Sequence, residues 1–432
     1  MNTDLEALIV EIKGRLSKIK QIEEYEIFVQ NARIQNIVIE GKPSEKTTNI
    51  EGLALRVITK ERKMGFFTAS FSQIPSLMAH FTERLGNLSF VEERTFLDLK
   101  KNRVSVPKIS EAMTERIREE AMEGEITDVN LHQAIHFIEE KKSISNSSSG
   151  DLIVSEQNRA IVNHLTYTFP AIKFRWSSNT QITSGSKLEI QKRSFLTEVK
   201  SKEETRFTKL KEKTIVVLTP NVLGKLLIEI TDLIRKNPSM ISPFLDEDLS
   251  IFDDPFHPFS FTSSTIDDEG LRTQPRWFYD STVSIPRERS IDPRYIQHGG
   301  NGFKISPYEF WPRLYSIPPT GHFTNLFLKG GWNRREFILG EKEYVLIDDA
   351  DIQLDLNQRV PSVTIQIKQG TKYSKSRSSE GLYGGSLQTD LRTILLCENL
   401  TKEAIGILHY SNMITTFTGY AAIPPDRLEL LP

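Results

Sequence analysis

Two histidines at helical spacing are the first residues in this sequence that could do chemistry. His132 and His136, in the stretch HQAIH, have the i, i+4 spacing at which two imidazoles on a helix hold one metal ion. Gln133 stands where a zinc peptidase of this kind has its general-base glutamate, and an amide cannot accept the proton. We expect a helix over residues 130–141, with a buried stripe of Leu131, Ala134, Ile135 and Ile138. The pair is therefore interpreted as solvent-facing or half-packed at the edge of that stripe, rather than as a metal site.

Clustered carboxylates offer a second kind of candidate site, for a hard cation. Asp267, Asp268 and Glu269 could supply oxygen ligands, but Gly270 follows directly, and this order favours a tight turn. A second cluster is interpreted as a solvated acidic loop, consisting of Asp246, Glu247, Asp248, Asp253 and Asp254. The sequence contains no Gly-x-Ser-x-Gly nucleophile elbow, no phosphate-binding P-loop and no dinucleotide fingerprint. These residues alone therefore leave the function open.

Length and composition limit the class of protein. The chain has 432 residues, a net charge of −2 and one cysteine, Cys397. That length predicts two or three domains, and a lone cysteine fits a reducing compartment, so we expect a cytoplasmic protein. Basic residues gather at 60–63 and 200–213, but glutamates are interleaved in both, so we expect a solvated face and no nucleic-acid partner. No apolar run is long enough to cross a bilayer, and the acidic start predicts an amphipathic helix instead of a signal peptide, so we expect no membrane association.

The N-terminal half shows mainly strand patterns. A meander of four short strands is predicted over residues 26–30, 34–40, 52–59 and 65–69. Helices are predicted over 74–85 and after Ser110, which stands at an N-cap position. The polar tract 143–150 has nothing to bury, so we expect an exposed, mobile loop. From residue 151 to about 206 the strand pattern returns, including 187–192 and 194–199.

A sharp change of character at Thr214 marks the main predicted boundary. The run TIVVL predicts a buried strand, and a helix over 222–235 follows, with one apolar side formed by Leu223, Leu226, Leu227, Ile230 and Leu233. Further β-type runs are predicted at 343–347, 362–367, 393–397 and 404–409, with an exposed loop at 372–381. We therefore predict an α+β protein, with an N-terminal α/β domain on a mainly antiparallel sheet and a C-terminal, mostly antiparallel β domain. The expected division is 1–105, a central α/β segment 106–213 that packs with it, and 214–432.

Four separated stretches resemble the TldD/PmbA metalloprotease family, in the family's order. In the first, the Gly-x-x-x-Arg-Val and Gly-Phe-x-Thr elements correspond to Gly52, Arg56, Val57, Gly65, Phe66 and Thr68. The second, VVLTPNVLGKLLIEITDLI, is similar to the family's strand, proline turn and helix. The third, TIDDEGLRTQPRWFYDSTV, resembles its Asp-Asp-Glu-Gly turn, threonine and hairpin. The fourth, PPTGHFTNLFLKGGWNRREFI, is similar to its Pro/Thr, Asn-Leu and Gly segment and the helix after it. Together the four stretches span nearly the whole chain.

The resemblance also implies which chemistry is missing. In the TldD branch the helix carries His-Glu-x-x-x-His, which brings two imidazoles to one zinc ion and a glutamate to the metal-bound water. The best ungapped match puts Ile228 and Leu233 at the histidine positions and Glu229 at the glutamate. Aliphatic side chains cannot coordinate a metal, and one carboxylate cannot hold a catalytic zinc. The chain therefore resembles the PmbA/TldE branch, and we expect no catalytic residue, metal or cofactor of its own, with Glu229 an exposed helix residue.

A role as a noncatalytic subunit follows from the resemblance. The family implies pairing with a zinc-bearing TldD-like chain, or a homodimer, in a protease that acts on unfolded or flexible peptides. An extended peptide could be held as an added strand at a sheet edge. The residues expected to face the substrate or partner cleft are Asp268, Glu269, Gly270, Thr324 and Asn325. Two alternatives stay open: a stand-alone scaffold or peptide-binding protein that kept the fold, and an active peptidase with unrecognised ligands.

Overall fold

The structure is a computed structural model in which strands predominate. It describes residues 5–40, 42–90, 102–105, 130–147, 152–169, 174–180, 204–207, 214–257, 262–280, 301–303, 315–317, 320–340, 343–374, 379–409 and 414–431, together with 112, 115, 119 and 260. These residues form the α+β fold that the sequence predicts. Over the same residues, no helix combines the length and the apolar character needed to cross a membrane.

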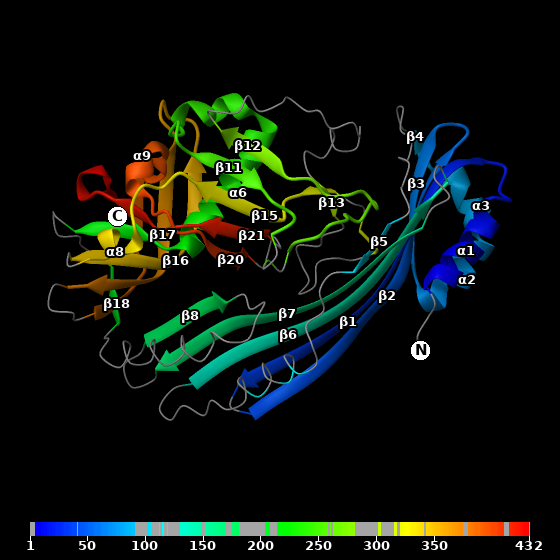
Figure 1. The fold of residues 1–432 in the computed structure, drawn as a ribbon, viewed down its shortest axis with the longest axis horizontal. Helices are drawn as coiled ribbons and strands as arrows, with labels where there is room; N and C mark the ends of the chain where they lie inside the picture. The colour runs from blue at the N-terminus through cyan, green and yellow to red at the C-terminus, as the bar shows by residue number, and fades with distance from the viewer. Residues whose placement is uncertain are drawn as a thin grey trace.

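The N-terminal half builds one long, curved sheet (Figure 1). Its strands, in spatial order, are β4 (Ser89–Phe90), β3 (Lys63–Ser70), β2 (Lys42–Thr59), β1 (Ile22–Glu40), β6 (Asn130–Asn146), β7 (Leu152–Phe169) and β5 (Asn102–Ser105), with β8 (Phe174–Thr180) also paired to β7. Strands β5 and β7 pair in parallel, and the other pairs are antiparallel. The sheet is therefore mainly antiparallel, as predicted.

One face of this sheet is closed by the first helices. Helix α1 (Leu5–Leu16) buries Leu5, Ile9, Ile12 and Leu16, which recur at helical spacing on one side. They pack against odd-numbered strand residues, namely Ile27, Val29, Leu53, Leu55 and Val57. Helices α2 (Ile74–Ala79) and α3 (Phe81–Arg84) complete this core with Leu77 and Phe81, and Figure 1 shows all three helices at one end of the sheet. Because side chains alternate along a strand, the even-numbered residues face the other way.

Several N-terminal predictions were wrong in their boundaries or type. The strands predicted at 26–30 and 34–40 are one continuous strand, β1. The helix predicted over 130–141 is strand β6, because that segment pairs with β1 on one side and with β7 on the other. The same strand continues into the polar tract as far as Asn146, so Ser143, Ser145 and Asn146 are buried where an exposed loop was expected, and residues 148–150 of the tract lie outside the described residues.

Other N-terminal predictions fall partly or wholly outside the described residues. The helix predicted over 74–85 is present, but it breaks at His80 into α2 and α3. After Ser110, only Ala112, Glu115 and Glu119 are described, and they are helical. The strands predicted at 187–192 and 194–199 lie outside the described residues.

The described residues of the C-terminal half form two further sheets and a two-stranded ribbon. The larger sheet orders β22 (Ala421–Ile423), β10 (Ile215–Leu218), β16 (Tyr344–Asp355), β17 (Ser362–Tyr373), β18 (Ser379–Tyr383) and β9 (Glu204–Arg206), and β19 (Ser386–Asp390) joins β17 to β23 (Glu429–Leu431). The smaller sheet orders β12 (Arg276–Asp280), β11 (Ser250–Asp253), β15 (Asn325–Lys329), β21 (Ile414–Thr418) and β20 (Ile405–His409). The ribbon joins β13 (Asn301–Phe303) to β14 (Thr320–His322). Most of these pairs are antiparallel, as predicted, and three are parallel: β10 with β16, β15 with β21, and β9 with β18.

Helix α6 (Pro220–Lys236) lies in the core between these sheets. It contacts β16 of the larger sheet and β20 and β21 of the smaller one. The strand predicted at 393–397 is instead the short helix α9 (Leu391–Leu395), because the side chain of Asp390 caps its first turn by accepting from Thr393 N at 2.7 Å. The loop predicted at 372–381 covers fewer residues than expected, because strand β17 extends to Tyr373 and strand β18 begins at Ser379. Residues 375–378 lie outside the described residues. The other helices whose bounds the structure describes are short: α8 (Arg335–Ile338), η1 (Phe71–Gln73), η2 (Leu85–Asn87), η4 (Pro238–Met240), η5 (Ser242–Phe244), η6 (Cys397–Asn399) and η7 (Pro425–Arg427).

Candidate functional site

Helix α6 carries the positions at which the resemblance looks for zinc ligands. Thr219 precedes the helix in an extended conformation and Pro220 opens its first turn, which is where proline is best tolerated. Ile228 and Leu233 are partly buried and pack against the main C-terminal core. Glu229 is exposed on the surface, although partial burial of its carboxyl raises its pKa. The helix therefore packs two aliphatic side chains against the core and directs one carboxylate outward.

A buried histidine lies against the same helix one turn earlier. Nε2 of His409, on β20, is 2.8 Å from Thr416 Oγ1 on the neighbouring strand β21. Both side chains press on Gly224, where a Cβ atom would lie 2.5 Å from His409 Nε2 and 2.2 Å from Thr416 Oγ1. Burial, reinforced by the charge of Lys225, lowers the pKa of His409 to about 3. His409 is therefore a neutral packing residue whose fit requires a glycine in the helix.

The histidine pair that opened the sequence analysis does not form a two-ligand clasp. His132 and His136 lie on strand β6, where four residues span about 13 Å, far more than one metal ion can bridge. Each contacts its cross-strand neighbour on β1: His132 Nδ1 bonds Glu40, and His136 Nδ1 lies 2.6 Å from Asn36 Oδ1. Within the described part of the chain, no group of three or more His, Cys, Asp or Glu side chains is arranged to hold a metal ion.

Thr324 and Asn325, two of the expected cleft residues, are buried in a polar cluster around Asp253. Asp253 Oδ1 accepts hydrogen bonds from Thr324 N at 3.0 Å, Thr324 Oγ1 at 2.8 Å and Asn325 N at 2.6 Å. Burial raises the pKa of Asp253 to about 6, against these bonds and the charge of Arg276, which lower it. The prediction of a solvated acidic loop is thus wrong for Asp253, because β11 carries it inside the smaller sheet.

Hydroxyl groups extend the Asp253 cluster to the next strand. Asn325 Nδ2 donates to Asp254 O at 2.6 Å and to Ser263 Oγ at 2.9 Å, so its Oδ1 faces the other way. That oxygen accepts from Ser260 and from Thr262 Oγ1, and both hydroxyls lie within 3.0 Å of Thr415 Oγ1 on β21. The segment after β11 is therefore tied by buried polar bonds to two strands of the smaller sheet.

The other expected cleft residues form the predicted turn. Gly270 has φ +83°, a left-handed conformation that glycine adopts without strain. Asp267 Oδ1 accepts from Glu269 N at 3.0 Å and from Leu271 N at 2.9 Å, which closes the turn. Asp268 and Glu269 are at most 2% exposed. Asp253 and this turn lie close together in the sequence, and all five expected cleft residues are buried.

The turn is held by charged residues of the N-terminal sheet. Lys142 Nζ, on β6, is 2.6 Å from Asp268 Oδ1 and also contacts the carbonyl oxygens of Ile266 and Asp267 at 3.3 and 3.4 Å. Arg56 Nη2, on β2, is 2.8 Å from Glu269 Oε1 and 2.5 Å from Glu26 Oε2. Burial alone would lower the pKa of Arg56, but Glu26 and Glu269 outweigh it and raise that pKa. The Asp-Asp-Glu-Gly turn therefore meets the arginine of the Gly-x-x-x-Arg-Val element.

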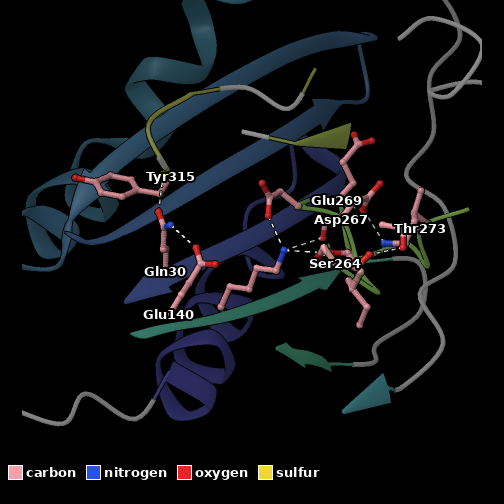
Figure 2. A network of polar contacts seen from close by, with 11 residues as sticks. Gln30, Glu140, Ser264, Asp267, Glu269, Thr273 and Tyr315 are labelled. Carbon is pink, nitrogen blue, oxygen red and sulfur yellow. Dashed lines mark hydrogen bonds and ion pairs between the residues drawn. The ribbon is translucent and has the colours of Figure 1, made fainter. Parts of the chain in front are cut away.

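A third contact joins the same two parts of the chain. Tyr315 N donates to Gln30 Oε1 at 2.9 Å, and Gln30 Nε2 donates to Glu140 Oε1 at 2.8 Å. Figure 2 shows Gln30 between Tyr315 and Glu140, beside the turn with Asp267 and Glu269. A Cβ atom on Gly52 would lie 2.2 Å from the Tyr315 ring, so the ring packs directly on the strand backbone. The glycine of the Gly-x-x-x-Arg-Val element thus makes room for this contact.

Sequence reasoning missed most of this arrangement. Arg56 and Gly52 were singled out only as family elements, without partners. Lys142 carries no signal of burial, because it is a charged residue that stands between the predicted helix 130–141 and the polar tract 143–150. His409 and Asp253 become notable only through burial, which depends on segments far away in the sequence.

Comparison with known proteins gives matches to solved structures. No family model and no curated protein matches the sequence. TldE from Thermococcus kodakarensis superposes with a TM-score of 0.68 at 15% identity, covering 97% of this chain and 98% of that one. A proposed modulator of DNA gyrase from Thermotoga maritima gives 0.65 at 17% identity, covering 99% of both chains. Another, from Bacteroides thetaiotaomicron, gives 0.63 at 13% identity, covering 98% of both.

The similarity extends from one end of the chain to the other, so it includes the long sheet as well as the C-terminal sheets. Identities of 13–17% are too low to transfer a function, but they accompany one shared architecture. The chain therefore has the fold of TldE and of these modulator-type proteins, which confirms, at the level of the fold, the resemblance to the TldD/PmbA family found in its sequence.

Proposed function

We propose that this protein is a noncatalytic, TldE-like subunit that pairs with a zinc-bearing TldD-like chain in a peptidase acting on flexible peptides. The observation that carries the proposal is the composition of helix α6 within this fold. At the positions that would hold zinc, Ile228 and Leu233 are aliphatic and packed against the core. Neither side chain has a lone pair for a metal, so the partner would supply the ion and its activated water.

Glu229 fits the same proposal. As the remaining member of the motif it could act as a general base only beside a metal-bound water. Its side chain is exposed on a helix whose other motif positions cannot hold the ion. Its role in a heteromer would then be structural at most, and the cytoplasm remains the expected location.

The protein would recognise an extended peptide mainly through hydrogen bonds to the peptide backbone. The smaller C-terminal sheet has β12 and β20 at the two ends of its strand order. An added strand at a sheet edge forms main-chain hydrogen bonds that tolerate many side chains, which suits a peptidase for unfolded segments. Of the expected cleft residues, Asn325 lies on β15, an interior strand of this sheet.

Reconstitution tests the proposal directly. The purified chain should contain no stoichiometric zinc and should cleave no peptide, whereas mixing it with a TldD-like chain should give cleavage that a chelator abolishes. Copurification from the native cell under mild conditions should bring down such a chain. If the protein alone binds one zinc ion and hydrolyses peptides, the proposal is wrong. If no partner is recovered and no mixture is active, the scaffold alternative is favoured.

A further inference from the structure

The face of the N-terminal sheet opposite the first helices is built as a docking face for the turn at 264–273. This docking face consists of even-numbered residues on three adjacent strands, namely Glu26, Phe28 and Gln30 on β1, Gly52, Ala54 and Arg56 on β2, and Glu140, Lys142 and Ile144 on β6. The strand register places Glu26 opposite Arg56, Phe28 between Ala54 and Ile144, and Gln30 between Gly52 and Lys142. Nine residues of one face thus form a compact patch from three strands that are consecutive in the sheet.

The chemistry of this patch differs from that of the opposite face. The odd-numbered face is apolar and closes on α1 with a large cluster of aliphatic side chains. On the docking face, the apolar cluster among the described residues has four buried members, Phe28, Ala54, Ile144 and Ile266. Around it, Lys142 pairs with Asp268 and Arg56 pairs with Glu26 and Glu269. Most of the named contacts across the interface are therefore ionic or hydrogen-bonded.

An interface of this kind can separate without unfolding either side. Exposing a large aliphatic face to water costs free energy in proportion to its area, whereas charged groups regain their hydration when the interface opens. Buried ion pairs also add little net stability, because desolvation offsets most of their attraction. Ion pairs such as those of Lys142 and Arg56 therefore fix the position of the turn while adding little net stability to the closed state.

We propose that Lys142 and Arg56 form a releasable latch, in which the 264–273 turn detaches from the docking face as a unit while the N-terminal sheet and the C-terminal core stay folded. In the closed state, Asp268 pairs with Lys142 and Glu269 pairs with Arg56, and both carboxylates are buried. Release uncovers them together with Gly270, while Ser260 and Thr262 stay bonded to Asn325 and Thr415 in the C-terminal core. The latch thereby controls access to three of the residues expected to face the cleft, whichever partner the protein has.

Thiol labelling measures this opening. Ala54→Cys places a thiol in the centre of the docking face, where Ala54 is 2% exposed. Ala69→Cys places a matched thiol on the opposite face, in the core against α1, where Ala69 is 5% exposed. The native Cys397, which is fully buried, reports on the C-terminal core in every variant. Each labelling rate is divided by the rate of the same thiol in the denatured chain.

The latch predicts a specific order of rates. Position 54 should label faster than position 69 or Cys397 in the native protein. Adding Lys142→Met removes the ion pair of the buried Asp268 with Lys142 and should accelerate labelling at 54 by roughly 100-fold or more, with 69 and Cys397 unchanged. Adding Asp268→Leu as well removes the buried carboxylate and should slow labelling again. Lys368→Met, which breaks the exposed pair with Asp351, serves as the control and should change none of the rates.

Two results would overturn the proposal. If positions 54, 69 and 397 label at one common rate that Lys142→Met raises equally, then the interface opens only through global unfolding. If Lys142→Met leaves labelling at 54 unchanged, then the ion pair does not hold the turn.

Discussion

Replacing Asp253 by asparagine should stabilise the protein at neutral pH and remove one part of its pH dependence. Asp253 Oδ1 accepts three hydrogen bonds, from Thr324 N, Thr324 Oγ1 and Asn325 N, and an amide oxygen can accept the same three. The wild-type carboxyl is buried, and its pKa is about 6 in the folded protein against 3.8 for the free side chain. Folding therefore favours the protonated acid, which asparagine resembles in charge and shape.

The direction and size of the effect follow from these two pKa values. The stability contributed by the protonated acid is fully present below pH 3.8 and is lost as the pH rises through about 6. The difference between the two values corresponds to about 3 kcal/mol of unfolding free energy. Since asparagine does not titrate, the advantage of Asp253→Asn over wild type should grow from near zero at about pH 4 to about 3 kcal/mol at about pH 8.

Urea unfolding of both proteins at several pH values between these limits measures that difference. Asp254→Asn is the matched control, because it makes the same chemical change at the next, half-buried position, whose Oδ1 accepts from Phe256 N at 3.0 Å. The control should show no comparable growth with pH. An advantage of Asp253→Asn that stays constant with pH would show that folding leaves the pKa of Asp253 unchanged. A variant less stable than wild type at about pH 8 would show that the three donors favour the ionised carboxylate. Either result would refute the prediction.

The remaining predictions use other sites. Gly224→Ala should destabilise the protein by about 1–3 kcal/mol in thermal or urea unfolding, since its Cβ would overlap His409 and Thr416, whereas Gly14→Ala in α1, with open space around it, should stabilise by up to about 1 kcal/mol. Equal effects of the two changes would contradict this packing. The neutral form of His409 contributes stability that is present above pH 6.5 and lost as the pH falls towards 3, so wild type should lose about 2 kcal/mol relative to His409→Gln between about pH 7.5 and pH 5. A pH-independent difference in urea midpoint would refute that. In an active mixture with a TldD-like chain, Glu229→Gln in this chain should leave peptide cleavage largely intact, and loss of cleavage would mean that this carboxylate takes part.

Local sequence patterns were enough to predict several parts of the fold. The amphipathic repeat of α1 places apolar side chains at the helical period. The aliphatic run of β10 is short, rich in β-branched residues and followed by a proline, which favours a buried strand. Pro220 and the apolar stripe after it likewise located α6 to within two residues. The identities of Ile228 and Leu233 alone exclude metal ligation at those positions, because side-chain chemistry does not depend on the fold.

Long-range contacts decided the rest. Residues 130–141 contain apolar side chains compatible with either a helix or a strand, and pairing with β1 and β7 on both sides selected the strand. That choice also separated His132 from His136 by a strand's rise and drew Lys142 and Ser143 into the interior. Similarly, Asp268 and Glu269 could be predicted to form a turn, but not to pair with Lys142 and Arg56, which lie more than one hundred residues earlier. The sequence by itself determined the elements whose residues interact with near neighbours, and it excluded metal ligation at the motif positions of α6. Burial and charge pairing depend on segments that are distant along the chain, so only the tertiary structure decided them.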